Sequence, residues 1–429
     1  MVNRQALDVE VSIGTDPASL TPAVFASDAQ GGTVIEDTLG ALSADTDYFY
    51  RIRYRRARHT SDADYRTYQL SPGDSVFRFH TKRAAGETFV VTLEADSHGG
   101  GRVDGSASDT SLYAVALANI LADSADLHFT LGDHVKGRAS ECSTYAEIYA
   151  DNLILRDRMS HVLVQTPFCF VLGNHEDEKG WIMTDADSNG VWSTQARMAL
   201  WPNPQDDGAY ENYYSFEWGD ALFVVLDPYR YTTSDPQEIG AVDGWRWTLG
   251  KTQYDWLYDT LHASTATWKI VLTHQLVGGA VPTGYGRGGT EWAGYFEWGG
   301  NDTADADVFS TKRSGWTHDP IHDMAVAEGV DLFVFGHDHV YVYQTLDDIV
   351  YLHVPKVSDS GYGDGAASVY TDESNVMYNN AGHIRMTVNP DSLVVQYVRA
   401  VLSADEPLVE NGDSIYNQTV SHRFTLTAE

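Results

Sequence analysis

The sequence predicts an α/β (α+β) fold in two parts, an all-β domain over residues 1–85 and a layered domain over residues 86–429. A chain of 429 residues exceeds what one hydrophobic core usually organises. Residues 7–81 read as short alternating strands separated by turns, without a helical period. Beyond a short linker at 82–87, apolar strands alternate with helix-like segments, which is typical of layered α/β architecture.

The first part carries a recognisable strand pattern. Residues 45–54, Asp-Thr-Asp-Tyr-Phe-Tyr-Arg-Ile-Arg-Tyr, and residues 77–81, Phe-Arg-Phe-His-Thr, resemble the end of a fibronectin type III-like β-sandwich. Such domains precede the catalytic domain in purple acid phosphatases and in alkaline phosphatases of the PhoD type. The resemblance therefore implies a catalytic domain after residue 85.

The second part is predicted to contain helices, one hairpin and two long loops. The hairpin spans residues 382–399 and turns at 389–392, Asn-Pro-Asp-Ser. Residues 177–214 and the Gly- and Trp-rich residues 275–314 read as irregular, either as lids over a site or as surface elaboration. The predicted helices are 111–121, 142–159 and 252–263.

The charge limits the possible partners. There are 61 acidic and 28 basic residues, of which seven are lysines, giving a formal net charge of −33. Such a chain repels long nucleic acids, which need basic patches for binding. The acidic, lysine-poor composition suits either simple solubility or a high-salt, marine or extracellular setting. No apolar run is long enough to cross a bilayer.

The two cysteines and the first residues decide little about the compartment. Cys142 and Cys169 do not have a zinc-binding spacing, and whether they form a disulfide is left open. Met1 is followed directly by a strand-like segment, without a basic region and apolar stretch. A secreted or periplasmic location is expected from the sandwich, the acidity and the resemblance to secreted phosphatases.

Five apolar strands each end in polar residues of the metal-binding kind. Unrelated structural histidines have no reason to follow five successive strands, so the conjunction predicts a metal site. Oxygen ligands mixed with neutral imidazoles suit zinc, manganese or iron better than calcium or copper. The clusters are Asp96-Ser97-His98, Gly132-Asp133, Gly173-Asn174-His175-Glu176, His274 and Gly336-His337-Asp338-His339.

This set resembles the DxH, GDxx, GNH(D/E), single-His and GHxH signature of the calcineurin-like metallophosphoesterase superfamily. The resemblance implies a four-layer β-sandwich flanked by helices and two metal ions, Mn, Zn or Fe, bridged by Asp133. His175 would lie beside the phosphate without binding metal. One ion would take Asp96, His98, Asp133 and His339, and the other Asp133, Asn174, His274 and His337.

Two departures and one further likeness refine the resemblance. Purple acid phosphatases would have glycine at the position of His98 and tyrosine at that of Lys136, so a ferric-tyrosinate centre is not expected. Many members carry an acidic residue near the Lys136 position to support the histidine of the Asn-His pair. Residues 286–289, Gly-Arg-Gly-Gly, are similar to a bacterial branch of the superfamily.

The implied reaction is hydrolysis of a small phosphomonoester or phosphodiester. Two cations about 3.5 Å apart hold a hydroxide that attacks phosphorus, while His175 protonates the leaving oxygen. Asn174, His175 and Arg287 are predicted to contact the substrate. Other polar residues could touch substrate or only orient ligands, and two tryptophans could stack on it or pack in the core. The polar residues are Arg102, His134, Glu176, His318 and Asp338, and the tryptophans are Trp292 and Trp298.

Two alternative functions stay open at this point. The same dinuclear scaffold could hydrolyse nucleotides, diesters or triesters, which the sequence does not separate. Alternatively, the chain could be an inactive or accessory extracellular binding protein that has kept the scaffold. The oligomeric state is also left open.

Overall fold

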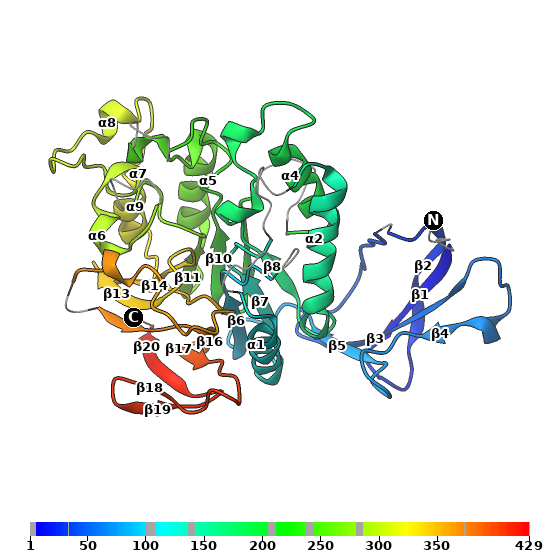
Figure 1. Cartoon of the computed structure of the whole chain (residues 1–429). Helices are drawn as coiled ribbons and strands as arrows, with labels where there is room; N and C mark the ends of the chain where they lie inside the picture. Colours follow the sequence, from blue (N-terminus) through cyan, green and yellow to red (C-terminus); the bar gives the residue numbers. More distant parts are fainter. Residues whose placement is uncertain are drawn as a thin grey trace.

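The computed structural model describes residues 6–32, 34–99, 108–135, 142–204, 212–236, 243–279, 286–372 and 375–428. Figure 1 shows an N-terminal sheet beside a larger body that contains the remaining strands and the helices. The predicted α/β (α+β) class is confirmed. No helix in the described ranges is both long enough and apolar enough to cross a membrane.

The N-terminal sheet has five strands. β3 pairs with β1, β4 and β5, and β2 lies at the other edge. The antiparallel register places Asp8 opposite Arg55 and Glu10 opposite Arg53, while the intervening Val9 faces Tyr54. Because side chains alternate along a strand, one face carries ion pairs and the other apolar residues. The strands are β1 (Leu7–Gly14), β2 (Thr21–Ala29), β3 (Asp47–Arg56), β4 (Arg66–Thr67) and β5 (Phe77–His80).

These five described strands all belong to one sheet. The next strand, β6 (Phe89–Glu94), already belongs to the body, so the predicted linker at 82–87 lies between the two parts. Tyr50 on β3 donates a hydrogen bond to the carbonyl of Val164 in the body, at 2.6 Å. The fibronectin type III-like sandwich and the boundary at residue 85 stay predictions.

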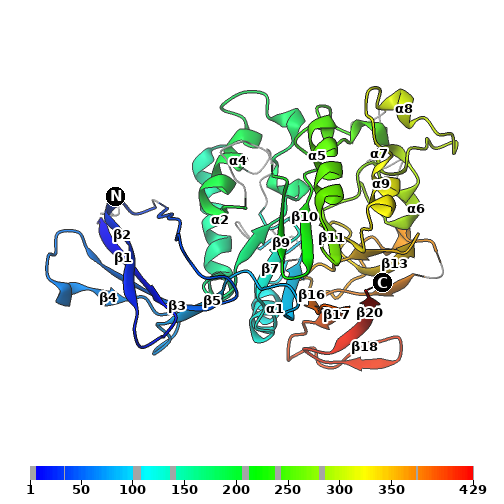
Figure 2. The same ribbon diagram turned by 180° about the vertical axis from the view of Figure 1, so that it is seen from behind.

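The body contains a seven-stranded and a six-stranded sheet. In the first, the order is β15-β13-β14-β12-β11-β10-β9, and in the second it is β20-β17-β16-β6-β7-β8. Figure 2 shows β9, β10 and β11 of the first sheet from behind. The bounds are β7 (Leu127–Thr130), β8 (Phe168–Phe170), β9 (Tyr214–Trp218), β10 (Ala221–Val225), β11 (Trp268–Leu272), β12 (Leu332–Phe335), β13 (Tyr341–Leu346), β14 (Ile349–His353), β15 (Val376–Tyr378), β16 (Gly382–Val388), β17 (Ser392–Arg399), β18 (Leu408–Glu410), β19 (Asp413–Ile415) and β20 (Val420–Thr427).

The two sheets pack face to face, with helices on their outer faces. Leu93 of β6 and Phe223 of β10 belong to one core cluster between the sheets. Val271 of β11 points the other way, into a second cluster with Leu257 of a helix. This alternation gives a four-layer sandwich, as predicted. The helices are α1 (Thr110–Ala122), α2 (Tyr145–Arg158), α3 (Ser160–Leu163), α4 (Asn189–Leu200), α5 (Gly250–Ala263), α6 (Thr290–Ala293), α7 (Phe296–Gly299), α8 (Phe309–Lys312) and α9 (Ile321–Ala327).

The local predictions are largely confirmed. α1, α2 and α5 occupy the three predicted helical segments, and β16 and β17 form the predicted hairpin. Asp109 caps α1 by accepting hydrogen bonds from the backbone of Ser111 and Leu112.

One prediction was wrong. Residues 177–214 are not irregular throughout, because they contain the twelve-residue helix α4. Gly190 and Thr194 weaken the helical signal, but α4 buries Val191, Ala196 and Leu200. Packing therefore overrides propensity. The short helices α6, α7 and α8 lie within the other predicted loop region.

Candidate metal centre

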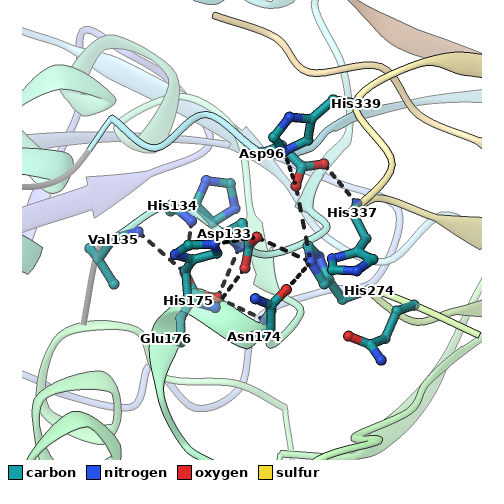
Figure 3. A network of polar contacts seen from close by, with 12 residues as sticks. Asp96, Asp133, His134, Val135, Asn174, His175, Glu176, His274, His337 and His339 are labelled. Atoms are coloured by element: carbon teal, nitrogen blue, oxygen red, sulfur yellow. Dashed lines mark hydrogen bonds and ion pairs between the residues drawn. The ribbon is translucent and has the colours of Figure 1, made fainter. Parts of the chain in front are cut away.

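The predicted ligands meet at the carboxyl ends of five strands. β6, β7 and β8 are mutually parallel in one sheet, as are β11 and β12 in the other, so their following loops converge at one edge of the sandwich. Figure 3 shows these loops bringing the side chains together. The residues gathered there are Asp96, His98, Asp133, Asn174, His274, His337 and His339.

The backbone of these loops is held in an unusual conformation. Positive φ angles, which are uncommon for residues with a side chain, recur at five ligand positions. The neighbouring Gly132 has φ of 94°, and a Cβ there would lie 2.4 Å from the backbone nitrogen of Gly173. The loops after β7 and β8 therefore touch backbone to backbone, which only glycine permits. The five are Asp96 (55°), His98 (41°), Asp133 (57°), His337 (72°) and His339 (55°).

The donor atoms fall into overlapping groups, each lying within 4.8 Å of one another. Asp96 Oδ1 lies 3.3 Å from His339 Nε2, and His98 completes that group. Asp133 Oδ2 lies 3.4 Å from His274 Nε2, and His337 completes the second. A third group joins His98, Asp133 and His175, and Asn174 Oδ1 is 3.2 Å from His274 Nε2. The two ligand sets that the resemblance implies stay predictions, and the third group also brings His175 within reach of Asp133.

The chemistry of the site fits a metal ion. Asp96 is fully buried, yet its Oδ1 has no hydrogen-bond partner among the described residues, and the same holds for Nδ1 of His98. Buried polar atoms without partners are rare in folded proteins and costly. Two carboxylates, an amide oxygen and several imidazoles form a donor set suited to zinc, manganese or iron.

The electrostatics favour the deprotonated forms of Asp133, His98 and His337, whereas the neighbouring carboxylates favour a protonated His274. Burial alone would raise the pKa of Asp133. The neighbouring His274 and His175 together have a larger, opposite effect, so the pKa of Asp133 lies well below its usual value. Burial lowers the pKa of His98 and of His337 well below that of a free imidazole. Burial acts in the same direction on His274, but the carboxylates of Asp133 and Asp96 raise its pKa to about 9. Neutral imidazoles and ionised carboxylates are the forms that bind metal.

Glu176 organises the loops rather than facing the substrate. Its carboxylate accepts four backbone hydrogen bonds, which join the loop after β7 to the 3₁₀ helix η2 (Asn174–Glu176) after β8. Burial and the Asp133 carboxylate raise the pKa of Glu176 to about 7. The donors are Gly173 (2.7 Å), Asp133 (2.9 Å), His134 (2.7 Å) and Val135 (3.2 Å).

The predicted substrate contacts border the cluster. The backbone N–H of His175 donates to Asp133 Oδ1 at 2.7 Å, and its Nε2 lies 3.7 Å from Asp133 Oδ2. Its ring packs edge-on against that of His98, with centroids 4.8 Å apart. Asn174 lies beside His274, and Nη1 of Arg287 is 3.6 Å from Asp338 Oδ1.

The other polar candidates are buried behind the ligand loops, pack on a helix or lie outside the described residues. His134 is fully buried, with Nδ1 2.8 Å from Ser97 Oγ. His318 stacks on Tyr258, with ring centroids 3.6 Å apart, in the helical region after α8. Arg102 and Lys136 lie outside the described residues.

Trp298 and the two cysteines lie in the protein interior. Trp298 is fully buried and donates a hydrogen bond to the hydroxyl of Tyr351 at 2.9 Å. Of the two predicted alternatives for Trp298, substrate stacking and core packing, the structure shows core packing. Trp292 packs against neighbouring aromatic rings. Cys142 and Cys169 are buried, and no disulfide joins them.

Sequence reasoning missed Tyr370, whose hydroxyl donates to Asp338 Oδ2 at 2.6 Å. It also missed Gln275, whose Oε1 accepts from the hydroxyl of Tyr229 at 2.9 Å. Gln275 directly follows the predicted ligand His274, and this position could have indicated that Gln275 lies near the site. No local pattern marks Tyr370.

Comparisons with known proteins agree with this site. The sequence profile of the PhoD-like phosphatase family matches residues 137–315. No curated protein sequence matches the chain. The structure of PhoD matches with a TM-score of 0.63 and 14% identity, covering 100% of this chain and 85% of PhoD. Purple acid phosphatase PPD1 from seeds of yellow lupin, Lupinus luteus, matches with a TM-score of 0.61 and 14% identity, covering 98% of this chain and 70% of the lupin protein.

The structural matches establish the fold, and the family match covers the segment with Asn174, His175, His274 and Arg287. The resemblance found in the sequence is thereby confirmed. The chain is a metal-dependent phosphoester hydrolase with the fold of the calcineurin-like metallophosphoesterases.

Proposed function

We propose that the chain is a dinuclear phosphoesterase that hydrolyses small phosphomonoesters or phosphodiesters. The observation that carries this proposal is the position of Asp133, whose carboxylate belongs both to the group with His98 and His175 and to the group with His274 and His337. One carboxylate shared between two donor groups is the arrangement that a bridged pair of ions requires. One ion would be held by Asp96, His98, Asp133 and His339, and the other by Asp133, Asn174, His274 and His337.

Two such ions, when bound, supply positive charge opposite the phosphoryl oxygens and activate water at neutral pH. The protein supplies the positioning. In this proposal Nε2 of His175 gives a proton to the leaving oxygen, because the ring borders the shared carboxylate and an imidazole can act as a general acid. The backbone bond from His175 to Asp133 and the contact with His98 keep the ring in place.

The substrate and the location belong to the same proposal. The net charge of −33 opposes binding of long nucleic acids and favours small esters. A secreted or periplasmic location is supported by the acidic, lysine-poor composition. An inactive binding protein is disfavoured, because the complete donor set is present at one edge of the sandwich and the PhoD-like phosphatase profile matches the chain.

Metal analysis of the wild type beside Asp133→Ala tests the proposal. Hydrolysis of p-nitrophenyl phosphate and of its bis ester would be assayed with added manganese, zinc or iron. We expect about two ions per wild-type chain, and in the variant a loss of metal together with at least about a 10³-fold loss of kcat.

Asp126→Ala is the matched control. Asp126 is a similarly buried carboxylate, but it pairs with Arg83 at 2.6 Å, outside the metal-binding loops. This variant should keep its metal and its activity. A wild type that is metal-free and inactive under every condition would overturn the proposal and favour a binding protein.

A further inference from the structure

Asp338 stands between two predicted ligands, His337 and His339, but its carboxylate contacts other segments. Its side chain is 1% exposed. Oδ2 accepts from the hydroxyl of Tyr370 at 2.6 Å and from the backbone N–H of Gly288 at 2.9 Å. Oδ1 faces Nη1 of Arg287 at 3.6 Å. One buried negative charge therefore connects the metal-binding loop to two segments that the sequence does not mark as ligands.

Tyr370 is a well-defined support for this carboxylate. It is 5% exposed, and its ring packs edge-on against that of His353, with centroids 5.1 Å apart. The backbone N–H of Ala366 also donates to the carbonyl of Asp338 at 2.8 Å. The segment around the 3₁₀ helix η5 (Ala367–Val369) thus holds Asp338 through both its side chain and its backbone.

The loop that carries Arg287 is fixed on both sides. Gly286, with φ of 68°, lies so close to Gln275 that a Cβ would be 2.1 Å from Gln275 Nε2. On the other side, Gly288 has φ of 93° and donates to Asp338. Gln275 follows the predicted ligand His274, so Arg287 is anchored between the loops of His274 and His337.

The guanidinium of Arg287 lies beside the metal-binding edge. It is 32% exposed, so solvent and a small molecule can reach it. Its charge also contributes, after burial and His274, to the lowered pKa of His337. A separation of 3.6 Å from Asp338 exceeds the roughly 2.7–2.9 Å of a tight charge-assisted hydrogen bond. Asp338 therefore forms an ion pair with the guanidinium but no bidentate hydrogen bond.

We propose that Arg287 binds the phosphoryl group of the substrate and that Asp338, supported by Tyr370, is the positioning residue that holds Arg287 for this task. The proposal rests on the phosphoesterase function proposed above and adds a substrate class to it. A planar guanidinium matches the geometry of phosphate oxygens. Because a phosphomonoester dianion carries twice the charge of a diester, Arg287 favours monoesters over diesters.

The test compares variants of this pair with a matched control. Arg287→Ala removes the cation, and Arg287→Lys keeps the charge but loses the planar fork. Asp338→Asn removes the orienting charge, and Tyr370→Phe removes the hydrogen bond that the Tyr370 hydroxyl donates to Asp338. Arg385→Ala is the control, because the side chain of Arg385 on β16 is 29% exposed and pairs with Asp123, whose side chain is 8% exposed.

KM and kcat for p-nitrophenyl phosphate and its bis ester would be measured, together with binding of inorganic phosphate by calorimetry and metal content. Loss of a charged hydrogen bond of about 1.5–3 kcal/mol predicts that Arg287→Ala raises KM for the monoester and Kd for phosphate roughly 10- to 100-fold. The effect on the bis ester should be smaller, and Arg287→Lys should recover part of the loss. Metal content should stay at the wild-type level.

The positioning role has its own readout. Asp338→Asn and Tyr370→Phe should raise KM for the monoester several-fold in the wild-type background and have little effect when Arg287 is already alanine, because residues acting through one another are not additive. A purely structural role would lower stability without this dependence. Equal KM and phosphate affinity in Arg287→Ala and Arg385→Ala would overturn the proposal, and equal losses on both esters would overturn the assigned substrate class.

Failure of this inference is distinguishable from failure of the proposed function. The latter shows as absent metal and activity in the wild type, whereas the former shows as an unchanged phosphate affinity in Arg287→Ala. Calorimetry measures the phosphate affinity of Arg287→Ala without requiring turnover.

Discussion

The N-terminal sheet and the metal-binding edge of the body both bury acidic side chains, but they balance the charge differently. In the sheet, Asp8 pairs with Arg55 at 3.1 Å and Glu10 with Arg53 at 2.8 Å. At the edge of the body, the ion-pair partners of Asp96 and Asp133 among the described residues are histidines. A buried carboxylate without arginine or lysine needs another cation. This difference separates structural ion pairs from a binding site.

The whole chain shows the same contrast. Residues 1–85 contain ten basic and eleven acidic residues, whereas residues 86–429 contain eighteen and fifty. Nearly all of the net charge of −33 therefore belongs to the part that carries the metal centre.

The largest expected difference between the two regions comes from removing one glutamate in each. Glu176→Ala leaves four backbone N–H groups without their acceptor, in the loops that present Asp133 and Asn174. We expect a loss of about 3 kcal/mol or more in the free energy of unfolding. Metal affinity and kcat should fall by roughly 10- to 100-fold. Urea unfolding, metal analysis and steady-state kinetics measure these changes.

Glu10→Ala is the counterpart in the sheet. It removes a partly exposed ion pair with Arg53, which contributes about 0–1 kcal/mol, and should leave metal content and kcat unchanged. Glu176→Gln keeps one acceptor oxygen and should fall between Glu176→Ala and the wild type. Normal metal binding and kcat in Glu176→Ala would show that the four backbone hydrogen bonds to Glu176 do not support the site.

Glu176 also illustrates what the sequence can predict. The ligands were predictable because each directly follows an apolar strand, which is a local signal. The role of Glu176 as a backbone acceptor depends instead on contacts such as that with Val135, 41 residues earlier in the chain. Likewise, the contact between Tyr370 and Asp338 spans 32 residues and has no local pattern. Sequence patterns predicted the candidate ligands, whereas contacts between distant segments determine how these residues are held.

The next expected difference concerns pH. Asp227, just after β10, is 1% exposed, and burial raises its pKa to about 6 from 3.8. Between these values the folded state binds more protons than the unfolded state, so stability falls as pH rises, and the loss is complete above pH 6. Asp227→Asn removes this dependence while keeping the oxygen that accepts from the backbone of Tyr229 and Arg230.

We therefore expect the free energy of unfolding of Asp227→Asn, relative to wild type, to increase by about 1–2 kcal/mol between pH 5 and pH 7.5. Urea unfolding in the presence of a chelator measures this without a contribution from metal. Asp126→Asn is the control, because Asp126 pairs with Arg83. A pH-independent difference between Asp227→Asn and wild type would contradict the raised pKa.

The smallest expected effect lies where the two regions meet. Tyr50→Phe removes the hydrogen bond to the carbonyl of Val164 and should cost about 0.5–1.5 kcal/mol without changing KM or kcat. Tyr54→Phe is the control, because the hydroxyl of Tyr54, on the same strand, makes no hydrogen bond to a described residue. Calorimetry separates two cases. If the sheet and the body unfold together, Tyr50→Phe lowers the midpoint of a single transition, whereas independent unfolding confines the shift to the transition of the less stable part.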